Sequence, residues 1–170
     1  MNILNIFKRQ KIKDIPQDEP LWYDDNWLFG NGTWNILKNH NEPLSQMPES
    51  NLCKFAFSFR ANGTRITVSA EALEDGKCRT IIENSRRDRK QYIQKSSLIK
   101  QLEEIMKKHS LYKWAGFRKS HEYHQGICEH FFMKAMFENG LQFEANGSSS
   151  FPEGFWEPMR EIFGLFGIRV

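Results

Sequence analysis

Alternation of hydrophobic and polar positions is the clearest pattern in the middle of the chain. A period of two places successive side chains on opposite faces of a strand, and an Asn-Gly pair favours the tight turn between antiparallel strands. Asn62-Gly63 divides two such alternating runs, and Asp75-Gly76 separates the second run from residues 78–83. The pattern predicts three consecutive antiparallel strands. Their buried face is formed by Phe55, Phe57 and Phe59, then by Ile66, Val68 and Ala70.

A helical period follows. Between Gln91 and His109, apolar residues recur every three or four positions, which predicts an amphipathic helix lying on the sheet. These apolar positions are Leu98, Ile99, Leu102, Ile105 and Met106. Residues 85–90 are predicted to be a charged connection into this helix.

The C-terminal part also shows a strand pattern followed by a helical pattern. Alternating apolar residues over 131–137 and 141–145 flank Asn139-Gly140, which predicts a second hairpin. Asn146-Gly147 is a further pair of the kind that favours tight turns. Ser150 is followed by Pro152 and Glu153, and this combination is typical of the start of a helix. A last helix is therefore expected, with an apolar stripe formed by Phe155, Trp156, Met159, Ile162, Phe163 and Phe166.

The order of these elements indicates the fold class. Three strands, a helix, two strands and a second helix predict an α+β fold, with an antiparallel sheet of about five strands and both helices on one face. Residues 51–170 form this core domain, and residues 1–50 are an aromatic-rich N-terminal arm that packs on the core or extends it. No nucleotide-binding βαβ crossover is expected.

Composition excludes several classes of protein. The 24 basic and 21 acidic residues are interspersed and leave a formal charge of +3, so no basic face for nucleic acid is predicted. Cys53, Cys78 and Cys128 are odd in number and widely spaced, which argues against a disulfide framework. The N-terminus has no continuous hydrophobic region of the signal-peptide kind, and no apolar run is long enough to span a membrane. We therefore expect a cytoplasmic protein without stable membrane insertion.

Two short motifs occur in the C-terminal part. The first reads Trp-Ala-Gly-Phe-Arg-Lys-Ser over 114–120, and the second reads Gly-Ser-Ser-Ser-Phe-Pro-Glu-Gly-Phe over 147–155. They resemble the Trp-x-Gly-Phe-x-Lys-Ser and Gly-Ser-x-x-Phe-Pro-x-x-Phe motifs of a bacterial α+β domain family without an established activity. Ala115 and Ser149 stand where Asn is commoner in that family. The resemblance implies a fold and no catalytic residues, and it implies architectural roles for Trp114, Gly116, Phe117, Gly147, Phe151 and Pro152.

One segment is rich in possible metal ligands. His121, His124, Cys128 and His130 fall close together, and zinc binds imidazole nitrogen and thiolate sulfur. Their spacing matches no zinc signature known to us. The alternative is that this segment is a loop before a strand and binds no cofactor.

Three functions remain open. The first is a non-catalytic interaction module of a bacterial cytoplasmic protein, with a protein partner and an immunity or accessory role. The second is a metal-dependent enzyme, a hydrolase, that uses the cluster from His121 to His130. The third is a small-ligand binder, since Trp22, Trp27 and Trp34 could stack on a flat ligand. These tryptophans could equally strap the arm onto the core.

Overall fold

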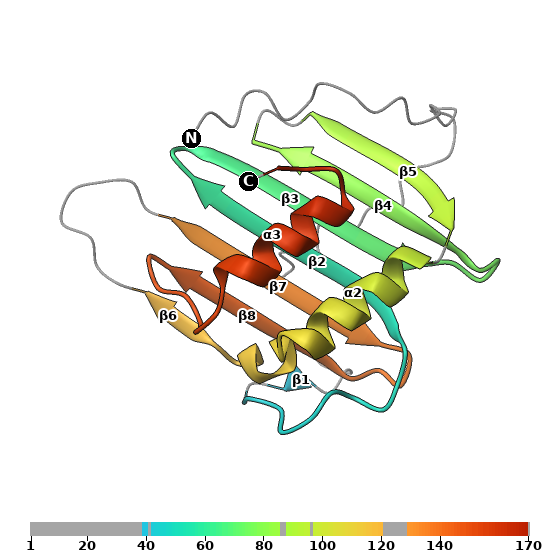
Figure 1. The fold of residues 1–170 in the computed structure, drawn as a ribbon, viewed down its shortest axis with the longest axis horizontal. Coiled ribbons are helices and arrows are strands. Elements are labelled where there is room, and N and C mark those ends of the chain that lie inside the picture. The colour runs from blue at the N-terminus through green and yellow to red at the C-terminus, as the bar shows by residue number, and fades with distance from the viewer. Residues whose placement is uncertain (1–38, 41, 86–87, 96, 121–128, 170) are drawn as a thin grey trace.

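The computed structural model of this chain describes residues 39–40, 42–85, 88–95, 97–120 and 129–169. Within them the fold is α+β, with a mostly antiparallel sheet and two α-helices, which confirms the predicted fold class (Figure 1). The strands are β1 (Asn39–His40), β2 (Leu52–Ala61), β3 (Thr64–Ala72), β4 (Lys77–Asn84), β5 (Arg89–Lys95), β6 (Arg118–Ser120), β7 (His130–Phe137) and β8 (Gln142–Ser148). The helices are α2 (Ser97–Lys108), the short 3₁₀-helix η3 (Leu111–Trp114) and α3 (Trp156–Leu165).

All the strands belong to one mixed sheet. Its order is β1-β8-β7-β2-β3-β4-β5, and β6 also pairs with β8. The pairs β1–β8 and β6–β8 are parallel, whereas the other neighbouring pairs are antiparallel. Since β7 occupies one edge of β8, the two short strands lie along its other edge. Asn39 pairs there with Gln142, and Arg118 pairs with Asn146.

The turn between β2 and β3 has the predicted geometry. Asn62 and Gly63 both have positive φ, 51° and 75°, and Ala61 pairs with Thr64 across the turn. This backbone twist matches that of the flanking strands. Phe57 therefore faces Val68 across the hairpin, and both side chains are fully buried.

The predicted number of strands is wrong. Within the described residues the sheet has eight strands, and about five were expected. The five long strands β2, β3, β4, β7 and β8 were anticipated, whereas β1, β5 and β6 were not. Residues 91–95 were assigned to the helix, but they belong to β5 and the helix begins at Ser97. An edge strand pairs on one side only and is often polar, so β5 lacks the alternation that marks a strand.

Two turn predictions also need correction. Asn146-Gly147 lies inside β8 and makes no hairpin turn. The last helix does not begin at Ser150, because α3 starts at Trp156. Gly154 has a φ of 71°, a left-handed conformation that interrupts a right-handed helix, so α3 starts only beyond it.

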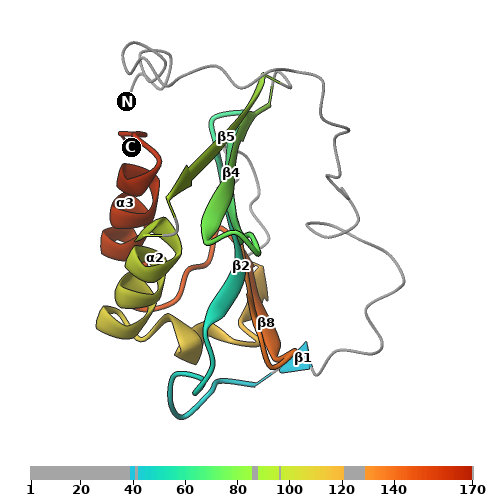
Figure 2. The same cartoon turned by 90° about the vertical axis from the view of Figure 1, so that its right-hand side faces the viewer.

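Both helices pack on one face of the sheet (Figure 2). The Phe57 ring from β2 lies 5.5 Å from that of Phe163 and 6.1 Å from that of Phe155, measured between centroids. The helix α2 adds its buried stripe of Leu98, Ile99, Leu102, Ile105 and Met106. Burial of one such side chain contributes about 1.5–3 kcal/mol, so this layer is the main source of stability.

The opposite face of the sheet carries buried polar groups. Thr67 donates a hydrogen bond from its hydroxyl to Ser58 Oγ at 3.0 Å, and both residues are buried. Lys134 is 3% exposed, and its Nζ lies 2.9 Å from Glu144 Oε1. A buried charge is tolerated only when it is paired, so Glu144 holds this lysine in place.

Candidate functional site

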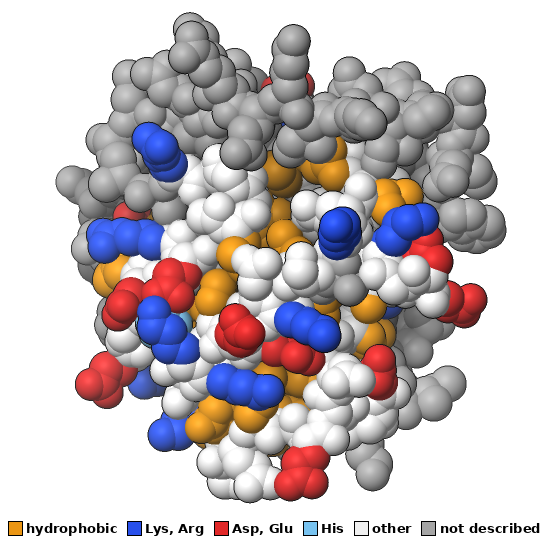
Figure 3. Space-filling model, turned by 45° about the vertical axis from the view of Figure 1, so that its right-hand side comes forward, with side chains coloured by type: hydrophobic (Ala, Val, Ile, Leu, Met, Phe, Trp, Pro, Cys, Tyr) orange, Lys and Arg blue, Asp and Glu red, His pale blue; other side chains and the backbone are white. Residues whose placement is uncertain are grey.

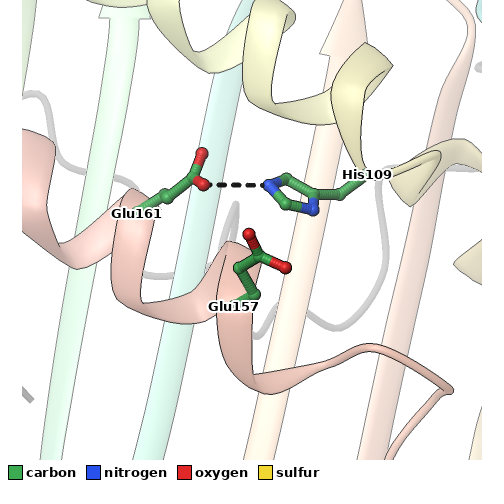
Figure 4. A group of neighbouring side chains, drawn as sticks. All are labelled: His109, Glu157 and Glu161. Carbon is green, nitrogen blue, oxygen red and sulfur yellow. Dashed lines mark ion pairs between the residues drawn. The ribbon is translucent and has the colours of Figure 1, made fainter.

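Three side chains with metal-binding atoms converge between α2 and α3 (Figure 4). His109 directly follows α2, whereas Glu157 and Glu161 lie one turn apart on α3. That spacing places both carboxylates on the same side of the helix. His109 Nε2 lies 3.2 Å from Glu161 Oε1, and one ligand atom from each of the three residues lies within 4.8 Å of the others. We call His109, Glu157 and Glu161 the interhelical cluster.

Lys108 sets the charge balance of the interhelical cluster. Its Nζ lies 2.5 Å from Glu161 Oε1, the same oxygen that faces His109. The hydrogen bond from Lys108 lowers the pKa of the Glu161 carboxyl, and the same bond raises the pKa of the Lys108 ammonium. Glu161 is therefore an anion at neutral pH. The interhelical cluster can hold a cation, and in this structure the Lys108 ammonium group lies beside Glu161.

Sequence reasoning missed the interhelical cluster. The i, i+4 spacing of Glu157 and Glu161 is visible in the sequence and predicts two carboxylates on one helical face. Nothing in the sequence indicated that His109 would meet them, because its approach depends on how α2 packs beside α3.

A second feature is an aromatic cluster at the N-terminal end of α3. Phe131 and Phe155 form its centre, with ring centroids 4.8 Å apart. Neighbouring rings lie 4.6 to 6.4 Å apart and tilt or stack against one another, which is the favourable range for aromatic pairs. Its members are Phe59, Trp114, Phe117, Phe131, Phe151, Phe155 and Trp156.

The outer part of this cluster reaches the solvent. Trp156 is 42% exposed and is the exposed large hydrophobic residue of the part of the chain that the structure describes. Its ring lies 5.2 Å from Phe151 and 5.9 Å from Phe59, and both of these are half-buried. We call Trp156, Phe151 and Phe59 the aromatic surface. Because the rings support one another, the indole is held in place before any partner arrives.

The residues of the two C-terminal motifs meet around the aromatic cluster. Trp114 stacks on Phe155 at 5.7 Å, Phe117 lies 5.9 Å from Phe131, and Phe151 lies 4.6 Å from Phe155. Gly116 has a φ of 73° and donates its N–H to Glu144 O, and Pro152 O accepts the N–H of Phe155. Gly147 is buried beside Phe131 and Phe117.

Most residues of the other predicted sites are not among the residues that the structure describes. His121, His124 and Cys128 lie outside the described residues, and so do the arm tryptophans Trp22, Trp27 and Trp34. His130 is described: it begins β7, is half-buried and pairs with Arg60 and Ser148. The zinc site and the small-ligand site of the sequence analysis therefore stay predictions.

A shallow depression of about 420 Å³ lies between the segment before β2 and α2. Two of its acidic side chains make hydrogen bonds within the protein. Glu103 accepts the N–H of Leu52, and Glu138 accepts a hydrogen bond from the Asn51 amide. Its lining is formed by Pro48, Glu49, Ser50, Asn51, Glu103, Lys107 and Glu138. The first bond joins β2 to α2, and the second joins the residue before β2 to the residue after β7, so Glu103 and Glu138 have structural roles.

Charges are mixed on the surface. On the face drawn in Figure 3, basic and acidic side chains are interspersed and neither sign gathers into a patch. Among the described residues, no helix has the length and apolar character that crossing a membrane requires.

The chain was compared with known proteins. No protein-family model and no curated protein matches it. The resemblance of the two C-terminal motifs to a bacterial family therefore remains a prediction. Function has to be inferred from the interhelical cluster and the aromatic surface.

Proposed function

We propose that this chain is a non-catalytic interaction module that binds a protein partner through the aromatic surface. The observation that carries the proposal is Trp156, which is 42% exposed although it rests on a packed aromatic cluster. Tryptophan is enriched among the residues that dominate binding energy at protein interfaces. A ring that is already fixed loses little conformational freedom on binding, which favours affinity.

The thiols support a non-catalytic role. Burial raises the pKa of the Cys78 thiol to about 11, and it also raises the pKa of Cys53. A catalytic cysteine needs a lowered pKa, since the thiolate is the nucleophile. Neither of these cysteines is therefore suited to nucleophilic catalysis.

The partner's chemistry follows from the surroundings of the indole. Glu153 and Glu157 are exposed on either side of Trp156 in the sequence. The exposed Arg160 lies one helical turn beyond Trp156, so the rim carries both signs of charge. A partner with an apolar pocket and a rim of charged groups of both signs would be complementary. The proposal includes the expectation of a bacterial cytoplasmic protein with an immunity or accessory role.

The test is affinity capture of the tagged full chain from a lysate of its own organism, followed by mass spectrometry. We expect one stoichiometric partner, whose affinity falls by at least about 2 kcal/mol, a factor of about 30, in Trp156→Ala. Because Trp156 also contacts Phe59 and Phe151, thermal unfolding of the variant must be measured alongside.

A charge reversal on the rim separates binding from folding. Glu153→Lys changes an exposed residue beside the aromatic surface and should weaken capture without lowering the melting temperature. Glu74→Lys is the matched control, since Glu74 is also exposed but lies in the turn between β3 and β4. A partner that is retained by Trp156→Ala and Glu153→Lys as well as by the control would refute the proposal.

A further inference from the structure

We propose that His109, Glu157 and Glu161 form a binding site for a divalent transition-metal cation, with Zn²⁺ as the favoured ion. One imidazole and two carboxylates supply the nitrogen and oxygen ligands that zinc accepts. Three protein ligands leave a fourth position for water, as in open zinc sites. None of its three ligands belongs to the aromatic surface, although Glu157 also contributes to the rim around Trp156.

The distances between the ligand atoms suit tetrahedral coordination of an ion. Two ligands bound at about 2.0–2.1 Å and at a tetrahedral angle are separated by about 3.3 Å. His109 Nε2 and Glu161 Oε1 are 3.2 Å apart. The third ligand atom lies within 4.8 Å of both, and the exposed Glu157 side chain can approach by a change of rotamer. Figure 4 shows its carboxylate directed toward the space between the other two.

The imidazole of His109 is the second indication of a ligand. Its Nε2 atom is buried and lies 3.2 Å from Glu161 Oε1, but it makes no well-formed hydrogen bond within the part of the chain that the structure describes. Its side chain is only 12% exposed. A buried polar atom without a well-formed hydrogen bond is costly, and a bound cation would satisfy it by taking the nitrogen lone pair.

Lys108 is the competitor for this position. Its ammonium is hydrogen-bonded to Glu161 Oε1, one of the proposed ligand atoms. The Lys108 side chain is 59% exposed, so it can swing into solvent when a metal ion binds. Removal of this lysine should therefore strengthen metal binding, whereas a purely structural cluster would gain nothing from its loss.

The expected effect of the ion is to join two elements that are far apart in the sequence. His109 follows the last turn of α2, and both glutamates lie in the first two turns of α3. A bound ion would fix the spacing of the helices and would raise the melting temperature, because it binds the folded state and not the unfolded one.

The test is titration of the untagged full chain with ZnCl₂ by isothermal calorimetry. The background for every measurement is the variant His121→Ala, His124→Ala, Cys128→Ser, which removes three of the four candidate zinc ligands of the segment 121–130 and keeps His130, the first residue of β7. We expect one Zn²⁺ per chain in this background. His109→Ala should weaken binding by at least about tenfold, since even indirect partners of metal ligands contribute that much.

Two further variants test whether the zinc ion binds at the interhelical cluster. Glu161→Gln keeps the shape of the side chain and should also weaken binding by at least about tenfold. Lys108→Met should strengthen it, by up to about fivefold, which corresponds to an exposed ion pair. Far-UV circular dichroism establishes that each variant is folded. The proposal is overturned if the background variant binds no zinc, or if folded His109→Ala and Glu161→Gln bind zinc as tightly as the background.

Discussion

Gly147 lies in β8 at a point where an added Cβ would fall 2.1 Å from Ser150 O and 2.6 Å from the Phe131 ring. Backbone and a packed ring cannot both move aside cheaply. We expect Gly147→Ala to lower the free energy of unfolding by about 1–3 kcal/mol, the usual cost of overpacking. Urea unfolding followed by circular dichroism measures this change.

Gly164→Ala is the control for that substitution. Gly164 lies in α3 with nothing within 4 Å of its added Cβ, so alanine should stabilise the protein by up to about 1 kcal/mol. Equal stability of the wild type and Gly147→Ala would show that the β8 backbone relaxes around the methyl group. The architectural role of Gly147 would then be refuted.

The Asn-Gly pattern predicts a turn correctly at Asn62-Gly63 and wrongly at Asn146-Gly147. In the first pair both residues need positive φ, which is a local requirement that the sequence displays. In the second pair Gly147 is required because Phe131 and Ser150 approach it. That approach is a tertiary contact, and a dipeptide pattern cannot distinguish it from a turn.

Among the elements, α2 contributes most through its buried stripe. Leu102 is fully buried between α2 and the sheet. We expect Leu102→Ala to lower the free energy of unfolding by about 2–5 kcal/mol, since it removes apolar contacts and leaves a cavity. Gln101→Ala, one position away and exposed, should change it by no more than about 0.5 kcal/mol. Urea unfolding of both variants tests the difference, and similar values for the two would contradict the packing of this helix.

The elements differ in how well the sequence predicts them. The long strands β2, β3 and β7 have one face toward the helices, so their alternation is plain. The edge strand β5 has adjacent Tyr92 and Ile93 among polar residues, and β6 has three residues, all exposed. Such strands are held by backbone pairing with β4 and β8, which leaves no hydrophobic signature.

At the scale of the whole molecule, the sequence does not predict which residues that are far apart in the chain lie close together in the fold. Lys108 and Glu161 are hydrogen-bonded although they are 53 positions apart. The sequence predicts both helices but not their mutual position, which is set by packing on the shared sheet face (Figure 2). The sequence therefore favoured a compact run from His121 to His130 as its metal site. The interhelical cluster brings ligands together through the fold instead.

The buried Cys78 thiol links the stability of the whole molecule to pH. Its pKa is raised from 9.0 to about 11 in the folded state, because burial disfavours the thiolate. Between these values the unfolded chain has lost the proton while the folded chain keeps it, so stability falls as the pH rises from 9 toward 11. The loss is at most about 3 kcal/mol, since each pKa unit corresponds to about 1.4 kcal/mol. Below pH 9 this contribution is fully present.

Comparison of the wild type with Cys78→Ala separates the effect of the Cys78 thiol on stability from the effects of other groups that titrate at high pH. We expect urea unfolding to show the wild type losing stability relative to Cys78→Ala as the pH is raised from 8 to 10.5. Cys53→Ala is the matched control: Cys53 is half-buried, so its thiol can be rehydrated at lower cost and the relative change should be smaller. A constant difference between wild type and Cys78→Ala across this range would mean that β4 opens locally and lets the thiolate reach water. Ionisation of the thiol would then be uncoupled from global unfolding, and the β4–β5 edge would be a separate, weaker unit of the sheet.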